Sequence, residues 1–391
     1  MTTEQKISTN LSFSSPVDAL LEATSKLLSA VPPKSPKPAL SNIQFTVRDG
    51  ILELTGTDFV AGIHYAIPAA SIKTEGIGLL NGAKFAEILK EFRGKDAQLV
   101  FSRKGGCQFK AEGGRYKISG DDIRDYPNTK RYEGKPGINL TGAELVEMVK
   151  KTAFAAAPEE SRLSINGVLF ELKGGRFRLV ATDNKRMSIT ERTYNTKLDD
   201  FSVSVPPKFL EAVLKVTTKD VADKPAVLGV IGTKIFYLLP GVTVYSTVLQ
   251  GDYPPYEEAM GIKLVHHFDC DTRELLATLR RSMLMSDTLA AFSFTEDRLS
   301  LNSTASSVGA GAADMEIAFK LPEGVEKIRV GFNPKYFKEA LEAMTSKRCR
   351  LLFEGPKKAG ILKEITVSDE KEAVSEQFTY AVMPALLPKE A

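Results

Sequence analysis

One short stretch of the chain, LVATDNKRMS at residues 179–188, has the residue types from which active sites are built. Asp183 is followed closely by Lys185 and Arg186, and a carboxylate beside two cations could begin an enzyme's acid–base site. A structural interpretation competes with this one. A Thr-Asp pair at the end of a strand readily forms a turn in which the Asp side chain accepts hydrogen bonds from backbone amides two residues on.

A repeat of the same pattern bears on this choice. The segments DGILELTGTDFV (49–60) and GGRFRLVATDNK (174–185) both read as a turn, an alternating strand and then Thr-Asp, about 125 residues apart. A weaker third copy, EDRLSLNSTASS, begins at residue 296. Asp58 occupies the place of Asp183 without a Lys-Arg pair after it. We therefore predict a structural turn role for Asp183 and expect any function in residues 184–187.

Amphipathic helices must position these strands. The segments SSPVDALLEATSKLLSAV, TGAELVEMVKKTAFAA and DTRELLATLRRSMLMS carry predicted N-caps at Ser15, Thr141 and Asp271, the second with Glu144 in a capping box. Three more helices follow a small-residue or proline break, in LLNGAKFAEILKEF, VSVPPKFLEAVLKV and VGFNPKYFKEALEAM. A period near 125 residues has the size of a domain.

The sequence thus predicts three copies of one α+β domain, each built from two halves of helix plus strands. The expected boundaries are 11–135, 136–262 and 263–391, after an N-terminal extension at 1–10. Each helix has one apolar stripe, so it must lie against a sheet.

Composition excludes several classes of protein. The 391 residues are 43% hydrophobic and 26% charged, the balance of a globular protein, and no apolar run approaches the length of a membrane helix. Neither a signal peptide nor a phosphate-binding, hydrolase or metalloprotease motif is visible, so we expect a cytoplasmic protein without a cofactor or metal. Three scattered cysteines suggest no chemistry. The net charge of +3 alone does not indicate a nucleic-acid protein.

Four segments within this three-copy pattern carry a resemblance to a known family. They are RLSINGVLFE, VATDNKRM, GDYPPY and the terminal YAVMP. Together they resemble the β sliding clamps, the processivity subunits of bacterial DNA polymerase III. The resemblance implies a head-to-tail homodimeric ring, with helices lining a hole that holds duplex DNA and sheets on the outside. It implies tethering of the polymerase by topology and no catalysis.

The resemblance also implies a pocket between the second and third domains, where the polymerase, the clamp loader and repair proteins insert short linear peptides. Its expected walls are Ile165, Thr182, Asn184, Lys185, Arg186, Met187, Pro254, Ala381, Met383, Pro384 and Ala385. Apolar walls with a polar rim suit a peptide with apolar anchors.

Cations occur at the faces or ends of all six helices. They are Lys26, Lys90, Arg93, Lys150, Lys151, Lys215, Lys219, Arg280, Arg281, Lys347 and Arg348, and the resemblance adds Lys34 and Lys37 in the loop VPPKSPKPAL. Cations at helix C-termini also complement the helix dipole, which explains individual cases. Their presence at all six helices favours a lining that attracts phosphates without reading sequence.

For ring closure, the resemblance places the strand RYKIS at the edge of the first domain, against SMLMS of another copy's third domain. Tyr116 and Ile118 would then pack on Leu284 and Met285. Two alternatives remain at this point. One is a repeat scaffold without a DNA role, and the other is an enzyme that uses Asp183, Lys185 and Arg186.

Overall fold

The computed structural model describes residues 10–67, 71–102, 106–158, 164–257, 266–295, 298–304, 312–318, 328–368 and 371–387. Of the predicted N-terminal extension, only Asn10 is among them. The chain divides into two compact units, one of Met1–Val146 with Val205–Val248, the other of Glu147–Ser204 with Leu249–Ala391.

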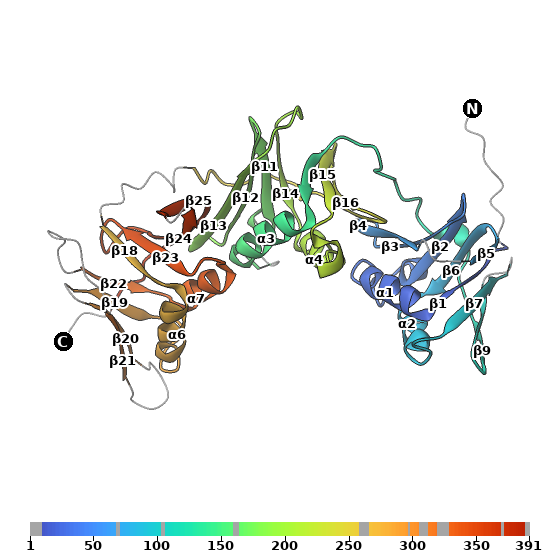
Figure 1. Cartoon of the computed structure of the whole chain (residues 1–391), viewed down its shortest axis with the longest axis horizontal. Helices are drawn as coiled ribbons and strands as arrows, with labels where there is room; N and C mark the ends of the chain where they lie inside the picture. Colours follow the sequence, from blue (N-terminus) through green and yellow to red (C-terminus); the bar gives the residue numbers. More distant parts are fainter. Residues whose placement is uncertain are drawn as a thin grey trace. The chain divides into compact units, whose positions relative to one another are not determined.

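The first unit contains two sheets (Figure 1). The eight-stranded sheet has the order β10 (Ile138–Thr141), β15 (Pro225–Ile231), β16 (Lys234–Leu239), β17 (Val242–Thr247), β4 (Ala61–Ile67), β3 (Ile51–Thr57), β2 (Asn42–Arg48) and β6 (Gly76–Asn81). The five-stranded sheet has the order β5 (Ser71–Thr74), β1 (Ser12–Pro16), β7 (Asp96–Phe101), β8 (Cys107–Ala111) and β9 (Gly114–Ile118).

The longer helices of the first unit bury one apolar stripe each, as their periodicity predicts. They are α1 (Val17–Leu27), α2 (Gly82–Lys90) and α4 (Pro207–Val216). The unit also contains the short helix α5 (Lys219–Ala222), which buries none of its residues, and the 3₁₀ turns η1 (Pro38–Ser41) and η2 (Ile123–Asp125). Helix α1 packs beside α2 and against β3 and β4, with Leu20 and Leu27 fully buried.

The second unit also contains two sheets. The eight-stranded sheet has the order β14 (Phe201–Val205), β11 (Val168–Lys173), β12 (Arg176–Thr182), β13 (Arg186–Thr193), β25 (Lys371–Val382), β24 (Gly360–Ser368), β23 (Arg348–Phe353) and β18 (His266–Asp271). The four-stranded sheet has the order β21 (Ala312–Ala318), β20 (Arg298–Thr304), β19 (Ala290–Phe294) and β22 (Ile328–Phe332). Helices α6 (Thr272–Ser282) and α7 (Pro334–Ala343) pack together, and the 3₁₀ turns are η3 (Ala153–Ala155) and η4 (Ser164–Asn166).

Two of the three predicted helix caps are confirmed. In α3 (Gly142–Thr152), the Glu144 amide donates to Thr141 Oγ1 at 3.2 Å and the Thr141 amide donates to Glu144 Oε2 at 2.7 Å, which completes a capping box. Asp271 accepts two amides at the start of α6. The prediction for Ser15 is wrong, because β1 continues through Pro16, which is itself the N-cap of α1 and offers no side-chain acceptor.

The sheets continue from one sequence repeat into the next. Strand β17 of the second repeat pairs antiparallel with β4 of the first, and β13 of the second repeat pairs antiparallel with β25 of the third. Each eight-stranded sheet therefore contains strands of two repeats. Helices packed on antiparallel sheets confirm the α+β prediction.

Candidate functional site

The stretch that suggested an active site is a tight turn between β12 and β13. Asp183 Oδ1 accepts hydrogen bonds from the amides of Lys185 and Arg186, at 2.9 and 3.0 Å. Thr182 Oγ1 donates to the Arg186 carbonyl at 2.7 Å. Asn184 has a φ of 69°, in the left-handed region that Asn tolerates better than most residues. Asp183 thus holds the backbone of the turn.

An equivalent turn connects β3 and β4 in the first repeat. Asp58 Oδ1 accepts from the amides of Val60 and Ala61, at 3.0 and 2.8 Å, and Thr57 Oγ1 donates to the Ala61 carbonyl at 2.7 Å. Phe59 has a φ of 76°, at the place of Asn184. The predicted structural role of Asp183 is confirmed, because the same bonds form where no Lys-Arg pair follows. The matching part of the third copy lies outside the described residues.

Arg186 is bound within the second unit. Its guanidinium donates to Asp183 Oδ2 at 3.0 Å, to Glu339 and to the Phe154 carbonyl at 2.8 Å, and it lies over the Tyr336 ring at 4.5 Å. Burial opposes the charge, but the bond to Glu339 and the nearby charges of Tyr380, Glu339 and Asp183 together outweigh burial and raise the pKa of Arg186 above its ordinary value. A permanently charged, fully bonded arginine organises a site and transfers no proton.

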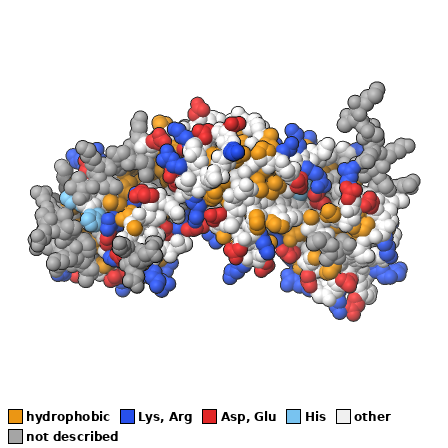
Figure 2. Space-filling model, turned by 45° about the horizontal axis from the view of Figure 1, so that its top comes forward, with side chains coloured by type: hydrophobic (Ala, Val, Ile, Leu, Met, Phe, Trp, Pro, Cys, Tyr) orange, Lys and Arg blue, Asp and Glu red, His pale blue; other side chains and the backbone are white. Residues whose placement is uncertain are grey.

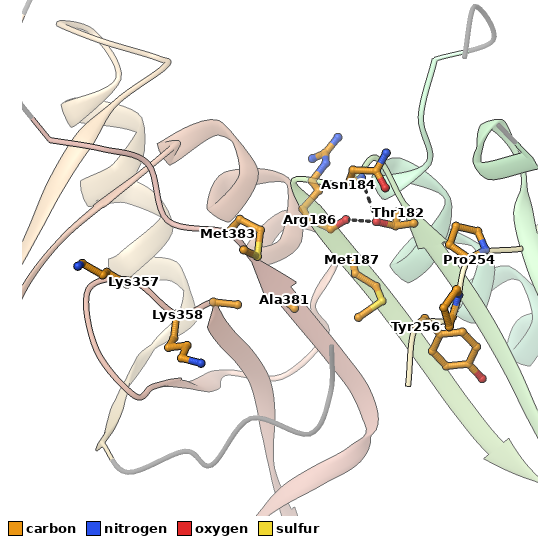
Figure 3. A pocket seen from close by; sticks show the side chains of 12 residues that line it. Thr182, Asn184, Arg186, Met187, Pro254, Tyr256, Lys357, Lys358, Ala381 and Met383 are labelled. Atoms are coloured by element: carbon orange, nitrogen blue, oxygen red, sulfur yellow. Dashed lines mark hydrogen bonds between the residues drawn. The ribbon is translucent and has the colours of Figure 1, made fainter. Parts of the chain in front are cut away.

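Beside this turn lies a cavity of about 370 Å³ (Figure 3). Its lining is Thr182, Asn184, Arg186, Met187, Pro254, Pro255, Tyr256, Lys357, Lys358, Ala359, Ala381 and Met383. Met187 and Ala381 are cross-strand partners on β13 and β25, and both belong to a buried cluster with Tyr256. Met383 is 52% exposed. A mostly apolar cavity with a few polar groups at its edge suits an apolar side chain of a ligand.

The structure brings together seven of the eleven residues predicted for the pocket. These are Thr182, Asn184, Arg186, Met187, Pro254, Ala381 and Met383. The other four do not line the cavity. Ile165 is a core residue at 1% exposure, and Lys185 contributes its carbonyl, which accepts from the Met383 amide at 2.8 Å. The amide of Ala385 donates to the Gly331 carbonyl at 2.7 Å, and Pro384, half-buried, also lies beyond the lining.

Sequence reasoning missed five lining residues. Pro255 and Tyr256 belong to the quoted motif GDYPPY, so a local signal for them existed. Lys357, Lys358 and Ala359 lie between β23 and β24, and only the pairing of β24 with β25 brings them to the cavity. Such pairing between distant strands leaves no local mark in the sequence.

We call the place where strands of two repeats pair a seam; β13 and β25 form one, and β17 and β4 form the other. The cavity lies at the seam of β13 and β25. At the seam of β17 and β4, aromatic side chains fill the equivalent space. Gly62 in the first repeat is equivalent to Met187 in the second. Gly62 is the cross-strand partner of Tyr245, whereas Met187 is the cross-strand partner of Ala381. A Cβ on Gly62 would lie 2.3 Å from the Tyr245 hydroxyl oxygen, so that ring occupies the space above the glycine. Tyr132 stacks on Phe236 beside it, with ring centroids 5.1 Å apart. Tyr245 and Tyr132 therefore fill the equivalent space at this seam.

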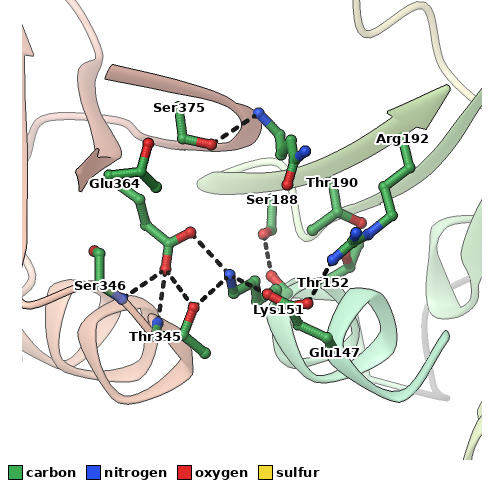
Figure 4. Close-up of polar contacts among 12 residues, drawn as sticks. Glu147, Lys151, Thr152, Ser188, Thr190, Arg192, Thr345, Ser346, Glu364 and Ser375 are labelled. Atoms are coloured by element: carbon green, nitrogen blue, oxygen red, sulfur yellow. Dashed lines mark hydrogen bonds and ion pairs between the residues drawn. The ribbon is translucent and has the colours of Figure 1, made fainter. Parts of the chain in front are cut away.

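The prediction that Lys151 faces DNA is wrong, because this lysine is a buried structural cation (Figure 4). Only 5% exposed, it donates to Glu364 Oε2 at 2.8 Å, Glu147 Oε1 at 2.7 Å and Thr345 Oγ1 at 3.1 Å. Burial opposes ionisation of Glu147, but hydrogen bonds and charges of Lys151 and Arg192 outweigh it and lower the Glu147 pKa. A lysine committed to two carboxylates is not available to a DNA phosphate.

Lys26 needs the same correction. It is 6% exposed, and its ammonium donates to Glu22 Oε1 at 2.6 Å and lies over the Tyr65 ring. Ten of the other predicted DNA-facing cations are exposed, namely Lys34, Lys37, Lys90, Arg93, Lys150, Lys215, Lys219, Arg280, Arg281 and Lys347. Arg348, at the start of β23, is half-buried and pairs with Glu372 at 2.5 Å. Basic and acidic side chains intermix over the visible face, in keeping with a net charge of +3 (Figure 2).

Among the predicted interface residues, three are partly or largely exposed. Leu284 is 80% and Met285 40% exposed after the end of α6, and Tyr116 is 42% exposed on β9, the edge strand of its sheet. Ile118 differs, because it is only 7% exposed in the single chain. Its side chain therefore already belongs to the core of the first unit, and it is a poor probe of an interface.

Comparison with known proteins shows the family. The N-terminal, central and C-terminal domains of the DNA polymerase III beta subunit match residues 11–130, 139–255 and 264–385 in turn. The chain belongs to the DNA polymerase III β-subunit family. Members of this family are non-catalytic accessory subunits of the polymerase, so the turn at Asp183 is not an enzyme's active site.

Individual β subunits resemble this chain over nearly its whole length. The beta sliding clamp of Salmonella typhimurium is 23% identical over 354 residues, which are 90% of this chain and 93% of that protein. That of Staphylococcus aureus is 24% identical over 361 residues, 88% and 93% of the two chains. A solved sliding clamp of Bacillus subtilis has a TM-score of 0.88 at 19% identity, covering 97% of this chain and all of that one. A clamp of Pseudomonas aeruginosa, solved bound to griselimycin, has a TM-score of 0.86 at 21% identity, again covering 97% of this chain and all of that one.

The described residues contain no cluster of potential metal ligands and no helix that could span a membrane. Cys270 and Cys349, distant in sequence, are cross-strand partners with their sulfur atoms 3.6 Å apart. The bond to Cys349 and burial raise the pKa of Cys270, which disfavours the reactive thiolate.

Proposed function

We propose that the chain acts as a sliding clamp, which closes around duplex DNA as a head-to-tail dimer and gives a DNA polymerase processivity. The observation that carries this proposal is the match of three consecutive β-subunit domains along the chain. The domain boundaries that we infer are 11–135, 136–262 and 263–391, and the cytoplasm is the compartment where such a clamp would meet DNA.

Contact with DNA is assigned to the exposed cations at the helix C-termini. Lys90, Lys150, Lys215 and Arg281 lie in the last turns of α2, α3, α4 and α6, and no ion pair is found for them within the described residues. Long cationic side chains in such positions can follow the phosphate backbone without contacting base edges. Sequence-independent contacts would leave the ring free to slide.

Ring closure is assigned to two sheet edges. Strand β9 is an edge of the five-stranded sheet and β21 an edge of the four-stranded sheet. Arg115 and Lys117 are exposed on β9, and Asp314 and Glu316 are exposed on β21. Opposite charges on two edges favour pairing of β9 from one chain with β21 from another, and pairing hides backbone groups that otherwise invite aggregation.

The cavity beside Met187 is assigned to partner proteins. A short peptide from the polymerase, the clamp loader or a repair protein would place an apolar side chain between Met187, Ala381 and Tyr256. Met383, largely exposed, can adapt its thioether to different guests. One pocket could then serve several clients in turn.

The DNA assignment is tested by changing Lys90, Lys150, Lys215 and Arg281 to Glu in one chain. Primer extension on a long single-stranded template, with cognate polymerase and clamp loader, should give shorter products because phosphate attraction becomes repulsion. The defect should grow as salt is lowered, since screening weakens both attraction and repulsion.

The same variant must keep its native mass and must still unfold in one cooperative thermal transition, at a somewhat lower temperature. Glu at helix C-termini costs some stability through the helix dipole, about 0.3–1 kcal/mol at each site. Products of unchanged length at low salt would show that these cations only complement the helix ends.

A further inference from the structure

The rim of the cavity carries two lysines on a short hairpin loop. Lys357 and Lys358 lie between β23 and β24, across the cavity from Pro254 and Tyr256 (Figure 3). The Lys358 amide donates to the Gly355 carbonyl at 3.2 Å, and Pro356 restricts the backbone between them. The next residue, Ala359, is buried and anchors the loop. Both lysines are exposed, so their ammonium groups stand in solvent beside an apolar space.

The charges of these lysines are not neutralised by the described residues. The third cation of the lining, Arg186, is bonded to Asp183 and Glu339. Neither an ion pair nor a hydrogen bond from the ammonium groups of Lys357 and Lys358 is found in the described part of the chain. The described residues of the lining include no carboxylate. The rim therefore presents uncompensated positive charge to whatever occupies the cavity.

Two described acidic residues that are next in sequence to the loop or to the lining do not change this balance. Glu354 is exposed and outside the lining. Glu257, which follows the lining residue Tyr256, lies 3.4 Å from Arg178 and pairs with it. Among the described residues of the lining, an incoming carboxylate would meet these two exposed cations and no competing acid.

We propose that the peptides accepted by this pocket carry a carboxylate, from Asp, Glu or a free C-terminus, next to their apolar anchor, and that Lys357 and Lys358 select it. This inference rests on the proposed function of the cavity as a peptide site. The apolar lining binds the anchor, and the hairpin loop sets which flanking residue is preferred. Charge at an exposed rim mainly affects discrimination and association rate.

The experiment begins with a displayed library of random peptides selected on the whole chain. The unsubstituted chain should enrich peptides with Asp or Glu beside a large apolar residue. The double variant Lys357→Gln, Lys358→Gln should lose the acidic enrichment and keep the apolar one. Lys173→Gln is the matched control, an exposed lysine at the opposite end of β11–β12 from the cavity, and should select as the unsubstituted chain does.

Calorimetric titration then quantifies the preference. The acidic peptide recovered most often should bind about fivefold or more tightly than its twin with Asn and Gln in place of Asp and Glu, and the difference should shrink in high salt. With the Lys357→Gln, Lys358→Gln variant the two peptides should bind alike. Equal binding of the twins to the unsubstituted chain, or no acidic enrichment, would overturn the inference.

A second variant separates this inference from the function on which it rests. Met187→Ala with Met383→Ala removes apolar contacts from the anchor, so both peptides should bind about tenfold more weakly or worse. If both twins bind the unsubstituted chain equally but lose affinity in the methionine variant, the peptide site stands and the acidic preference fails. Unchanged binding in the methionine variant would remove the peptide site itself and the inference with it.

Discussion

At the scale of single residues, Lys150 and Lys151 show how neighbours on one helix take opposite roles. Lys150 is exposed at the end of α3, whereas Lys151 is buried between Glu147 and Glu364. Glu364 also accepts the amides of Thr345 and Ser346, at 2.6 and 3.2 Å. Lys151 thus ties a helix of the second repeat to a strand of the third inside the second unit.

Removing Lys151 should destabilise the second unit. Lys151→Ala leaves the Glu364 carboxylate buried without its cation, and breaking a buried pair in this way costs roughly 3–5 kcal/mol. Lys150→Ala, one residue away and exposed, should change stability by about 0.5 kcal/mol or less. Urea unfolding followed by circular dichroism measures both shifts. A Lys151→Ala midpoint equal to that of Lys150→Ala would show that the network is not structural.

The family resemblance, carried by short motifs, predicted which residues form the pocket. Met187 and Arg186 belong to the motif VATDNKRM and Pro254 to GDYPPY, and all three line the cavity. Ile165 has the right apolar type but lies in the core, because η4 carries it inward. Residue type alone cannot tell a buried lysine such as Lys151 from an exposed one, since one of its two carboxylate partners, Glu364, is more than 200 residues distant.

At the scale of elements, the turn at Asn184 depends on a backbone conformation that few side chains adopt easily. Its φ of 69° favours Gly, tolerates Asn and penalises a β-branched residue. Asn184→Gly should leave stability unchanged or raise it by up to about 1 kcal/mol. Asn184→Val should lower it by about 1–2 kcal/mol. Both are read from thermal or urea transitions, and a Val variant as stable as the Gly variant would contradict the assigned conformation.

Elements with a local signature were predictable from the sequence, and their partners were not. The capping box at Thr141 and Glu144 and the Asp turns were correctly anticipated, because each involves residues close in the chain. Continuation of the sheets from β17 to β4 and from β13 to β25 was not, because strand pairing joins distant segments. Met187 and Ala381 pair at one seam, and Gly62 and Tyr245 pair at the equivalent position of the other. The two seams therefore have different surfaces.

At the scale of the whole molecule, closure of the proposed ring requires a dimer. The chain mass is 42.7 kDa, so the native particle should have about twice this mass. Leu284→Asp with Met285→Asp places two charges on exposed apolar residues and should give a folded monomer, since burying unpaired charge opposes association. Light scattering measures the mass. Leu386→Asp, at a fully exposed apolar residue outside the proposed interface, should stay dimeric. A dimer that survives the double substitution would place the interface elsewhere.

A closed ring that encircles DNA is held there by topology, so linearising the DNA reveals it. With cognate clamp loader and ATP, the chain should load onto a nicked circular plasmid and stay with it through gel filtration at moderate salt. Cutting the plasmid once should release the protein, because a ring held by topology slides off a free end. Protein that remains on the linear molecule would be bound by ordinary affinity. That result, or failure to stay on the circle, would show that the chain does not form a closed ring around DNA.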